Sequence, residues 1–255
     1  MIRLDTDIDS ALHARARQRA LIEGRGPRVS EFLLNPYRFG GGGGGGADPY
    51  FSNVVLLMHG DGTPGATSTV DSSSYARTIS SAGTVLPTLS STQAKFGATS
   101  MAFTGANNSA FTAAASADFG FGTGDFTVEF WIYLNSLSTA PYPISNGSAS
   151  GGQGWYINFG SGGDMIWGWA GTVNAANTFG TTGAITTGSF LHLAFSRVSG
   201  TLRSFKNGVQ LGSNLAHTVN YTTSARMLSV GRDNTSGNNV NGYIYTDRPI
   251  YRPNH

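Results

Sequence analysis

Cysteine is absent from this chain of 255 residues, and charged residues make up only 12% of it. Without cysteine there can be no disulfide framework and no thiolate metal site. The sequence also lacks an apolar run of membrane-spanning length. Residues 1–12 alternate charged and apolar side chains, unlike the continuous apolar segment of a signal peptide. We therefore expect no insertion into a membrane.

Charge of either sign is scarce in most of the chain. Residues 1–39 hold seven arginines and five acids, whereas residues 40–255 hold nine basic and nine acidic residues. The net charge of +2 therefore comes from the N-terminal segment. A nucleic-acid-binding fold needs a basic face, so the neutral remainder argues against a nucleic-acid partner.

Residues that form turns and strands are abundant. Glycine occurs 36 times, and Ser, Thr and Asn fill much of the remaining sequence between β-branched and aromatic residues. This mixture is typical of many short strands separated by turns. A chain of this length can be one large all-β domain or two smaller ones.

The first 39 residues predict an anchoring arm, made of a short helix and a hydrophobic extended segment. Residues 1–24 can form a helix capped by Asp7 or Asp9. Its apolar stripe is too thin to stabilise a helix alone, so the alternatives are docking to a partner or a frayed, solvated helix. We favour docking. The residues expected to dock are Ile8, Leu12, Arg15, Arg19, Phe32, Leu33, Tyr37 and Phe39.

A glycine linker is predicted to follow the arm. Residues 40–46 are seven consecutive glycines, which lose too much backbone entropy on ordering to form regular structure. No GK[ST] sequence follows, so this is not a phosphate-binding loop. The predicted organisation is an arm at 1–39, a linker at 40–49 and a folded body at 50–255.

One stretch of the body reads as its central strand. After the turn formed by Gly120, Gly122 and Gly124, residues 126–134 are a continuous β-prone run. Phe126, Val128, Phe130, Ile132 and Leu134 alternate with a set that begins polar and becomes aromatic. We expect the first set to face a core and the second to be covered over part of its length, as in a two-layer sheet protein.

Further strands are predicted throughout the body, with no helix of useful length. Asn207-Gly208, between two β-prone runs, is the strongest hairpin signal. The other predicted strands lie at 54–58, 80–86, 98–103, 154–159, 165–170, 190–198, 201–206, 209–211, 227–231 and 240–245. Ten to twelve strands with turns between them predict an all-β, antiparallel, two-sheet jelly-roll sandwich.

Several segments occur in an order and spacing that resemble a known family. They are LLMHGDGT, VDSSS, KFGATSMAFTG, FGTGDFTVEFWIY, HLAFSRVSGTLRSFKNGVQL and LSVGRDNTSGNNVNGYI, within about residues 52–245. Together they resemble the laminin-G-like, concanavalin-A-like jelly-roll domains, in the version found in bacteriophage structural and tail proteins. The resemblance implies two packed antiparallel sheets that serve adhesion, carbohydrate binding or scaffolding. It does not cover the arm.

The C-terminus departs from that family pattern. Such domains usually end with acidic residues and a further strand, whereas here Pro249 and Pro253 follow Gly242-Tyr243-Ile244. Because proline cannot donate a ladder hydrogen bond, the final strand must be an edge or stop early. The acidic pair is missing, which weakens the case for a site that depends on it.

Catalysis is disfavoured by the scarcity of carboxylates. Glycoside hydrolases of this superfamily need two positioned acids, yet residues 40–255 contain one glutamate, Glu129, and eight aspartates. We expect Glu129 to be an acid on the more exposed face of its strand. His59, His192 and His217 have no evident acid partner in the sequence, and no nucleophile elbow is present. We predict that the protein is not an enzyme and has no catalytic residues.

Calcium is the cofactor to consider, since laminin-G-like domains often bind it at a loop edge. Asp61, Asp71 and Asp247 are the candidate ligands. The alternative is that Asp61-Gly62 and Asp71-Ser72 are ordinary turn formers. We favour the alternative and expect no cofactor.

A carbohydrate site is suggested by aromatic residues that cluster in the sequence. Trp155, Tyr156, Trp167 and Trp169 could stack on sugar rings, and Asn158, with Asn174 and Asn177, could supply amides. The competing interpretation is that these aromatics fill the core of the sandwich. Because Trp167 and Trp169 share one side of a strand, both should be buried or both exposed.

These observations and the resemblance favour a non-catalytic virion component of a bacteriophage. The arm would dock to a capsid, collar or tail protein, and the body would be displayed outward for adhesion or stabilisation. Symmetric homo-oligomers and contacts with host surface glycans are expected. The alternative is a carbohydrate-binding, lectin-like module. A glycoside hydrolase is the less favoured third hypothesis.

Overall fold

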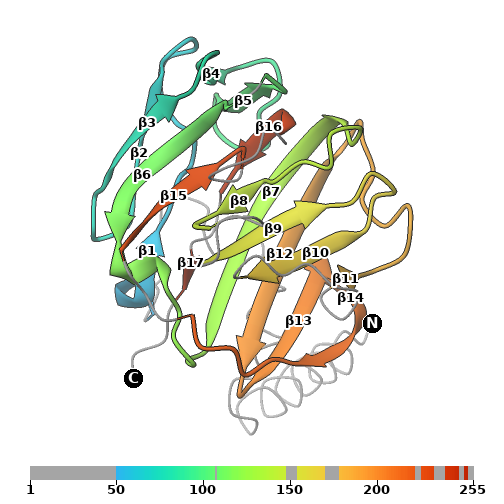
Figure 1. Ribbon diagram of the computed structural model, residues 1–255. Helices are drawn as coiled ribbons and strands as arrows, with labels where there is room; N and C mark the ends of the chain where they lie inside the picture. Colours follow the sequence, from blue (N-terminus) through green and yellow to red (C-terminus); the bar gives the residue numbers. More distant parts are fainter. Residues whose placement is uncertain are drawn as a thin grey trace, which may run out of the picture. The chain divides into compact units, whose positions relative to one another are not determined.

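The body of the protein consists of two antiparallel sheets in the computed structural model (Figure 1). The structure describes residues 50–106, 108–147, 154–169, 178–221, 225–232, 239–246 and 250–251. The arm at 1–39, its eight docking residues and the linker at 40–49 lie outside the described residues, so their organisation stays a prediction. The fold itself agrees with the predicted all-β jelly-roll sandwich.

Sheet A has nine strands in the described part of the chain. They are β1 (Val54–Leu56), β4 (Thr88–Ser90), β5 (Ser100–Thr104), β7 (Phe126–Ser136), β12 (Phe190–Val198), β13 (Thr201–Lys206), β14 (Val209–Ala216), β16 (Asn241–Tyr245) and β17 (Ile250–Tyr251). Their order is β14-β13-β12-β7-β16-β5-β4, and β17 pairs with both β1 and β7. The last strand of the described residues, β17, covers Ile250–Tyr251, and the prolines on either side of it lie outside the described residues.

Sheet B has eight strands among the described residues. They are β2 (Ser68–Val70), β3 (Thr78–Ala82), β6 (Ala110–Ser116), β8 (Ile144–Ser145), β9 (Trp155–Phe159), β10 (Met165–Trp169), β11 (Thr178–Phe179) and β15 (Arg226–Val230). Their order is β11-β10-β9-β8-β15-β6-β3-β2. In Figure 1, β9 and β10 of this sheet cross in front of β12 and β13 of sheet A.

Helical structure in the described residues is limited to two short 3-10 turns, η1 (Phe51–Asn53) and η2 (Ala117–Phe119). Within the same residues, no helix is long and apolar enough to cross a membrane.

The central strand β7 follows the predicted alternation. Phe126, Val128, Phe130, Ile132 and Leu134 are all buried in the core between the sheets. β7 lies between β12 and β16, which confirms its central position. Its alternate residues therefore point away from sheet B.

The Asn207-Gly208 hairpin is also confirmed, since it joins β13 to β14 with Lys206 opposite Val209. Both residues have positive φ, 50° and 80°, as a type I′ turn requires. A second turn of this kind, Ser199-Gly200, joins β12 to β13 and was not recognised in the sequence.

The described residues form 17 strands rather than the ten to twelve predicted, because β2, β4, β6, β8, β11 and β17 were not predicted. The strand expected at 80–86 covers residues 78–82 instead, and the chain then turns through Gly83, whose φ is 123°. β6 was missed because its sequence, AFTAAAS, is rich in alanine, which has low strand propensity. Pairing with β3 and β15 determines its conformation instead.

Candidate functional site

The predicted carbohydrate-binding aromatics lie in the core. Trp155, Tyr156 and Trp167 are each completely buried. The Trp155 and Trp167 rings stack with their centroids 5.1 Å apart, and both pack near Phe121. The Trp155 indole nitrogen donates a hydrogen bond to the Phe119 carbonyl oxygen. These rings are closed to a sugar, so the competing interpretation, core packing, describes them.

The other members of that set are also engaged within the protein. Asn158 is buried, and its side-chain amide donates to the Ala140 carbonyl oxygen at 2.7 Å. Trp169 is half-buried against the core and meets His217 edge to face at 4.7 Å. Trp167 and Trp169 thus share a side of β10 with different exposure, because Trp169 ends the strand. Asn174 and Asn177 lie outside the described residues.

The predicted calcium ligands do not come together in the described residues. Asp71 is buried, and its two carboxylate oxygens accept hydrogen bonds from the backbone N–H groups of Leu57, Ser73 and Arg77. This is the turn chemistry offered as the alternative. Asp61 is exposed and lies 3.8 Å from His59, and Asp247 is outside the described residues. No group of three acids or histidines suited to a metal occurs in the described part of the chain.

The outer face of sheet A, turned away from sheet B, gathers the side chains that the core leaves out. On β7 these are Thr127, Glu129, Trp131 and Tyr133. The register places Ala194 of β12 opposite Glu129, and His192 opposite Trp131. On the other side, Tyr245 of β16 lies opposite Trp131. Three adjacent strands therefore bring an acid, a histidine and two aromatic rings together.

Glu129 corrects two expectations from the sequence. It is buried, with only 2% of its side chain exposed, although we expected an exposed acid. Its Oε2 lies 3.3 Å from Nε2 of His192, so this histidine has an acid partner after all. That oxygen is buried and has no hydrogen-bond donor with good geometry in the described residues.

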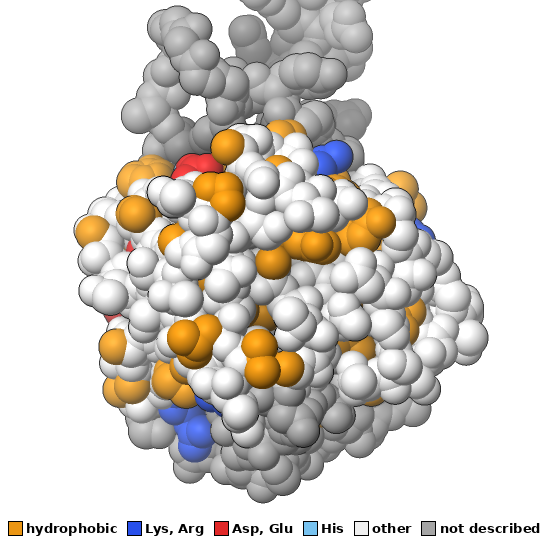
Figure 2. Space-filling model, turned by 90° about the horizontal axis from the view of Figure 1, so that it is seen from above, with side chains coloured by type: hydrophobic (Ala, Val, Ile, Leu, Met, Phe, Trp, Pro, Cys, Tyr) orange, Lys and Arg blue, Asp and Glu red, His pale blue; other side chains and the backbone are white. Residues whose placement is uncertain are grey.

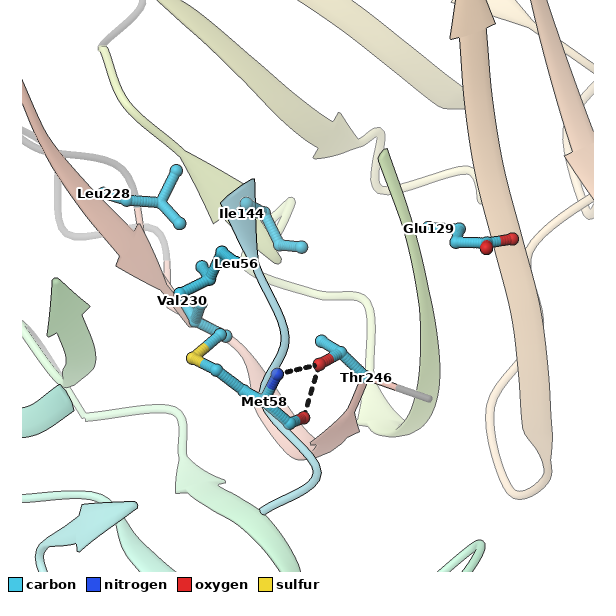
Figure 3. A pocket seen from close by; sticks show the side chains of 7 residues that line it. All are labelled: Leu56, Met58, Glu129, Ile144, Leu228, Val230 and Thr246. Carbon is cyan, nitrogen blue, oxygen red and sulfur yellow. Dashed lines mark hydrogen bonds between the residues drawn. The ribbon is translucent and has the colours of Figure 1, made fainter. Parts of the chain in front are cut away.

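A small cavity inside the sandwich is lined in part by Glu129, but the carboxylate of this residue does not point into it (Figure 3). It is lined by Leu56, Met58, Glu129, Ile144, Leu228, Val230 and Thr246. Figure 3 shows the carboxylate of Glu129 pointing away from the other six side chains, toward β12. The Thr246 hydroxyl is held by the backbone of Met58, whose N–H donates to it at 2.7 Å. The cavity is therefore an apolar packing feature, separate from the outer face.

The aromatic patch lies around Trp131, and we define it as His59, Phe96, Trp131, His192 and Tyr245. Phe96 meets Trp131 edge to face at 5.6 Å and Tyr245 at 5.5 Å. His192 lies 5.0 Å from Trp131, and His59 stacks on Tyr245 at 6.2 Å. Phe96 is 39% exposed, while Trp131, His192 and His59 are half-buried. Phe96 is therefore the exposed ring of the patch, Trp131, His192 and His59 reach the surface in part, and Tyr245 is buried at 5% exposure.

A cation accompanies the patch. The ammonium of Lys95 lies 4.3 Å from the centre of the Trp131 ring and 5.6 Å from that of Phe96. A second aromatic group continues along the sheet, where Tyr133 contacts Phe190 and Tyr243. The sequence indicated only that the alternate face of β7 turns aromatic. It gave no signal for Phe96 or Lys95, which come from a loop before β5.

A buried polar network lies at one end of the sandwich. The Arg197 guanidinium is completely buried and donates to the carbonyl oxygens of Gly122, Gly124 and Val219. Its carbon lies 4.9 Å from the centre of the Phe126 ring and 5.2 Å from that of Tyr221. Burial lowers the pKa of Arg197. Arg197 therefore connects β12, by hydrogen bonds, to the loop that contains Gly122 and Gly124 and to the loop that contains Val219.

Tyr221 and His217 complete this network. The Tyr221 hydroxyl accepts a hydrogen bond from the indole nitrogen of Trp167 at 2.6 Å and also contacts Nε2 of His217. Burial raises the pKa of Tyr221. Burial first, and then the positive charge of Arg197, lower the pKa of His217 to about 4. Both groups are therefore neutral near pH 7, and the network is a structural clamp rather than a site open to a ligand.

The comparisons with known proteins agree with this architecture. A family model described as the concanavalin A-like lectin/glucanases superfamily matches residues 104–248. Comparison with curated proteins gives no match.

Solved structures share the fold at low sequence identity. The binding domain of Paraclostridial Mosquitocidal Protein 1 is 14% identical, with a TM-score of 0.57 over 81% of this chain and 50% of that one. Domain 4 of AbnA, an arabinanase from Geobacillus stearothermophilus solved with arabinotriose, is 19% identical, with a TM-score of 0.51 over 69% and 82%.

A third structure is that of botulinum neurotoxin type C, whose cell entry depends on two ganglioside molecules. It is 14% identical, with a TM-score of 0.53 over 79% of this chain and 48% of that one. This chain thus spans about half the length of the two toxin chains. Together with the sheet topology, the family match shows that the chain belongs to the concanavalin A-like lectin/glucanase superfamily.

Proposed function

We propose that the body is a non-catalytic glycan-binding module whose binding face is the aromatic patch on the outer face of sheet A. The observation that carries this proposal is the partly exposed group of rings around Trp131, which is accompanied by a cation and includes a histidine paired with the buried Glu129. Aromatic faces with a few fixed polar groups are the usual composition of small-ligand sites. The structurally similar toxin, whose cell entry depends on gangliosides, and the arabinanase domain solved with arabinotriose support the class of ligand.

The arrangement around Glu129 supports binding rather than hydrolysis. A glycosidase needs two carboxyl groups on either side of the scissile bond. The neighbours of Glu129 on its own face are Thr127 and Trp131 along β7, Ala194 across from it, and His192, whose Nε2 lies 3.3 Å from Oε2. None of these is the second carboxyl group that hydrolysis would need. Some relatives are glycoside hydrolase domains, but their likeness extends to the fold alone.

The test is a glycan array probed with the full chain and with two variants. Trp131→Ala removes the central ring of the patch, and we expect it to abolish binding while the melting temperature falls only slightly. Phe51→Ala is the control, since Phe51 is similarly exposed, at 38%, but lies outside the patch. No glycan bound by the unmodified protein, or equal binding by both variants, would rule out this site.

We further propose that the module belongs to a bacteriophage virion, where the arm at 1–39 docks to a capsid, collar or tail protein. This second proposal is supported by the amphipathic, arginine-bearing arm and the seven-glycine linker. It is also supported by the sequence resemblance to phage structural domains. The nearly neutral body suits outward display, and Figure 2 shows few charged side chains on the face seen from above. Homo-oligomers remain part of this proposal.

Particle incorporation tests the virion proposal separately from sugar binding. Virus particles are purified from cells that express either the full chain or a chain lacking residues 1–46, and the protein is quantified by immunoblotting. We expect only the full chain to be incorporated, while both bind the same glycans. Incorporation of the shortened chain at an equal level would show that the arm is not the anchor.

A further inference from the structure

The ammonium of Lys95 lacks a carboxylate partner in the described residues. The interactions recorded for it there are with two rings, Trp131 at 4.3 Å and Phe96 at 5.6 Å. Lys95 is half-buried, so its charge is partly removed from water without being neutralised. Because the ammonium is partly desolvated, its attraction to an anion is screened less than that of a fully hydrated lysine.

Two acids of the described residues lie beside the patch, and each has a histidine nearby. The Asp61 carboxylate lies 3.8 Å from Nδ1 of His59, and that of Glu129 lies 3.3 Å from Nε2 of His192. Glu129 is also beneath the surface, with 2% of its side chain exposed, whereas Asp61 is 64% exposed and hydrated. Among the described residues, Lys95 is therefore the cation that contacts rings of the patch.

From this geometry we infer that the patch selects sugars that carry a carboxylate, such as a sialic acid or a uronic acid. The inference rests on the proposed function and adds the chemical class of the ligand. The face of the sugar ring would pack on Trp131 and Phe96, and Lys95 would form a charge-assisted hydrogen bond with the carboxylate. Lysine binds anions as a point charge without a fixed planar geometry, so both kinds of acidic sugar fit.

The competing ligand would be a neutral sugar that displaces Lys95 from the ring. If Lys95 is displaced, its cation–π contact is lost, and the ammonium gains only hydration by water in exchange. An acidic sugar keeps the ammonium close and adds an opposite charge to it. The same rings therefore favour the acidic ligand, and the preference should weaken as salt screens the charge.

The experiment measures dissociation constants of the full chain by calorimetry, with two acidic probes and their neutral counterparts. The probes are 3′-sialyllactose with lactose, and trigalacturonic acid with galactotriose, each at low and high salt. The first pair tests sialic acid as the source of the carboxylate, and the second tests a uronic acid. We expect tighter binding of at least one acidic probe than of its neutral counterpart.

Three variants test whether Lys95 causes the preference for an acidic sugar. Lys95→Gln should weaken binding of the acidic probe about fivefold, the size expected of a partly exposed ion pair, and leave the neutral probe unchanged. Lys95→Arg keeps the charge and should keep the preference. Arg203→Gln is the matched control, because it removes a charge from β13, a strand of the same sheet two positions from β7.

Each other outcome overturns the inference in a distinguishable way. Equal binding of acidic and neutral probes, with both lost in Trp131→Ala, would overturn charge selection but leave the proposed function intact. A preference that survives Lys95→Gln but is lost in Arg203→Gln would overturn the role of Lys95. Binding of none of the four probes would overturn both the inference and the proposed sugar site.

Discussion

The protein places two aromatic clusters on opposite faces of the same central strand. On the inner face of β7, Phe126 stacks with Phe121 and Trp167 between the sheets. On the outer face, Trp131 meets Phe96 and His192 where solvent reaches them. The same types of residue therefore build the core on one face and form the patch on the other. Successive side chains of β7 point to opposite faces of the sheet, so one cluster is buried and the other is partly exposed to solvent.

The largest effect is expected from the inner cluster. Trp167→Ala removes a completely buried ring that contacts Trp155, Phe126 and Phe195. The free energy of unfolding should fall by about 3–5 kcal/mol, as for other large-to-alanine changes in cores. Urea denaturation followed by tryptophan fluorescence would measure it. A loss below about 1 kcal/mol would contradict the packing described here.

The second effect concerns the charge buried beside that cluster. Arg197→Met keeps an apolar stem but leaves the carbonyl oxygens of Gly122, Gly124 and Val219 without their donor. We expect a loss of about 3 kcal/mol in the free energy of unfolding, because buried acceptors that lose their donor are costly. Arg203→Met is the control, since Arg203 is only half-buried and should change stability by less than about 1 kcal/mol.

The third effect depends on pH and comes from His217, whose pKa is about 4 in the folded protein and ordinarily 6.5. The unfolded chain binds the proton more tightly, so the contribution to stability is complete above pH 6.5 and is lost as the pH falls toward 4. The full difference amounts to roughly 3 kcal/mol.

Urea titrations at several pH values between 4 and 7 would test this, with His217→Gln as the comparison. The variant should show a flatter dependence of stability on pH in that window. Parallel curves for the two proteins would mean that His217 is not responsible.

The smallest effect on stability is expected from the outer cluster. Trp131→Ala should cost only about 1 kcal/mol, because the ring is half-buried and water can replace part of its surroundings. The same change should abolish glycan binding if the patch is the site. Thermal melting and the glycan array, measured on the same variant, would show whether the inner cluster stabilises the fold while the outer cluster binds glycans.

The sequence predicted local structure better than it predicted the site. Strands β12 and β13 and the Asn207-Gly208 turn were predicted at their observed positions, because alternation and turn chemistry act over a few residues. β6 was missed, since its alanines carry no strand signal and its pairing partners are distant in sequence. The fold class followed from many such local signals together.

The candidate site could not be predicted in this way. Trp155, Trp167 and Trp169 attracted attention because they are close in sequence, but the fold uses them mainly for its core. The patch is assembled from five separate segments: the sheet register brings residues 131, 192 and 245 together, and loops contribute residues 59 and 96. The Glu129–His192 pair was likewise invisible, because its members lie on different strands.

The pairing of β1 with β17 bears on how the chain reaches its native state. In the described residues β1 has only β17 as a partner, and Met58 bonds to Thr246, 188 positions later. The first strand of the body therefore cannot complete its ladder until residues 250–251 have left the ribosome. Closing so long a loop is entropically slow. Newly made chains should pass through a stage in which residues 54–58 are accessible to chaperones and proteases.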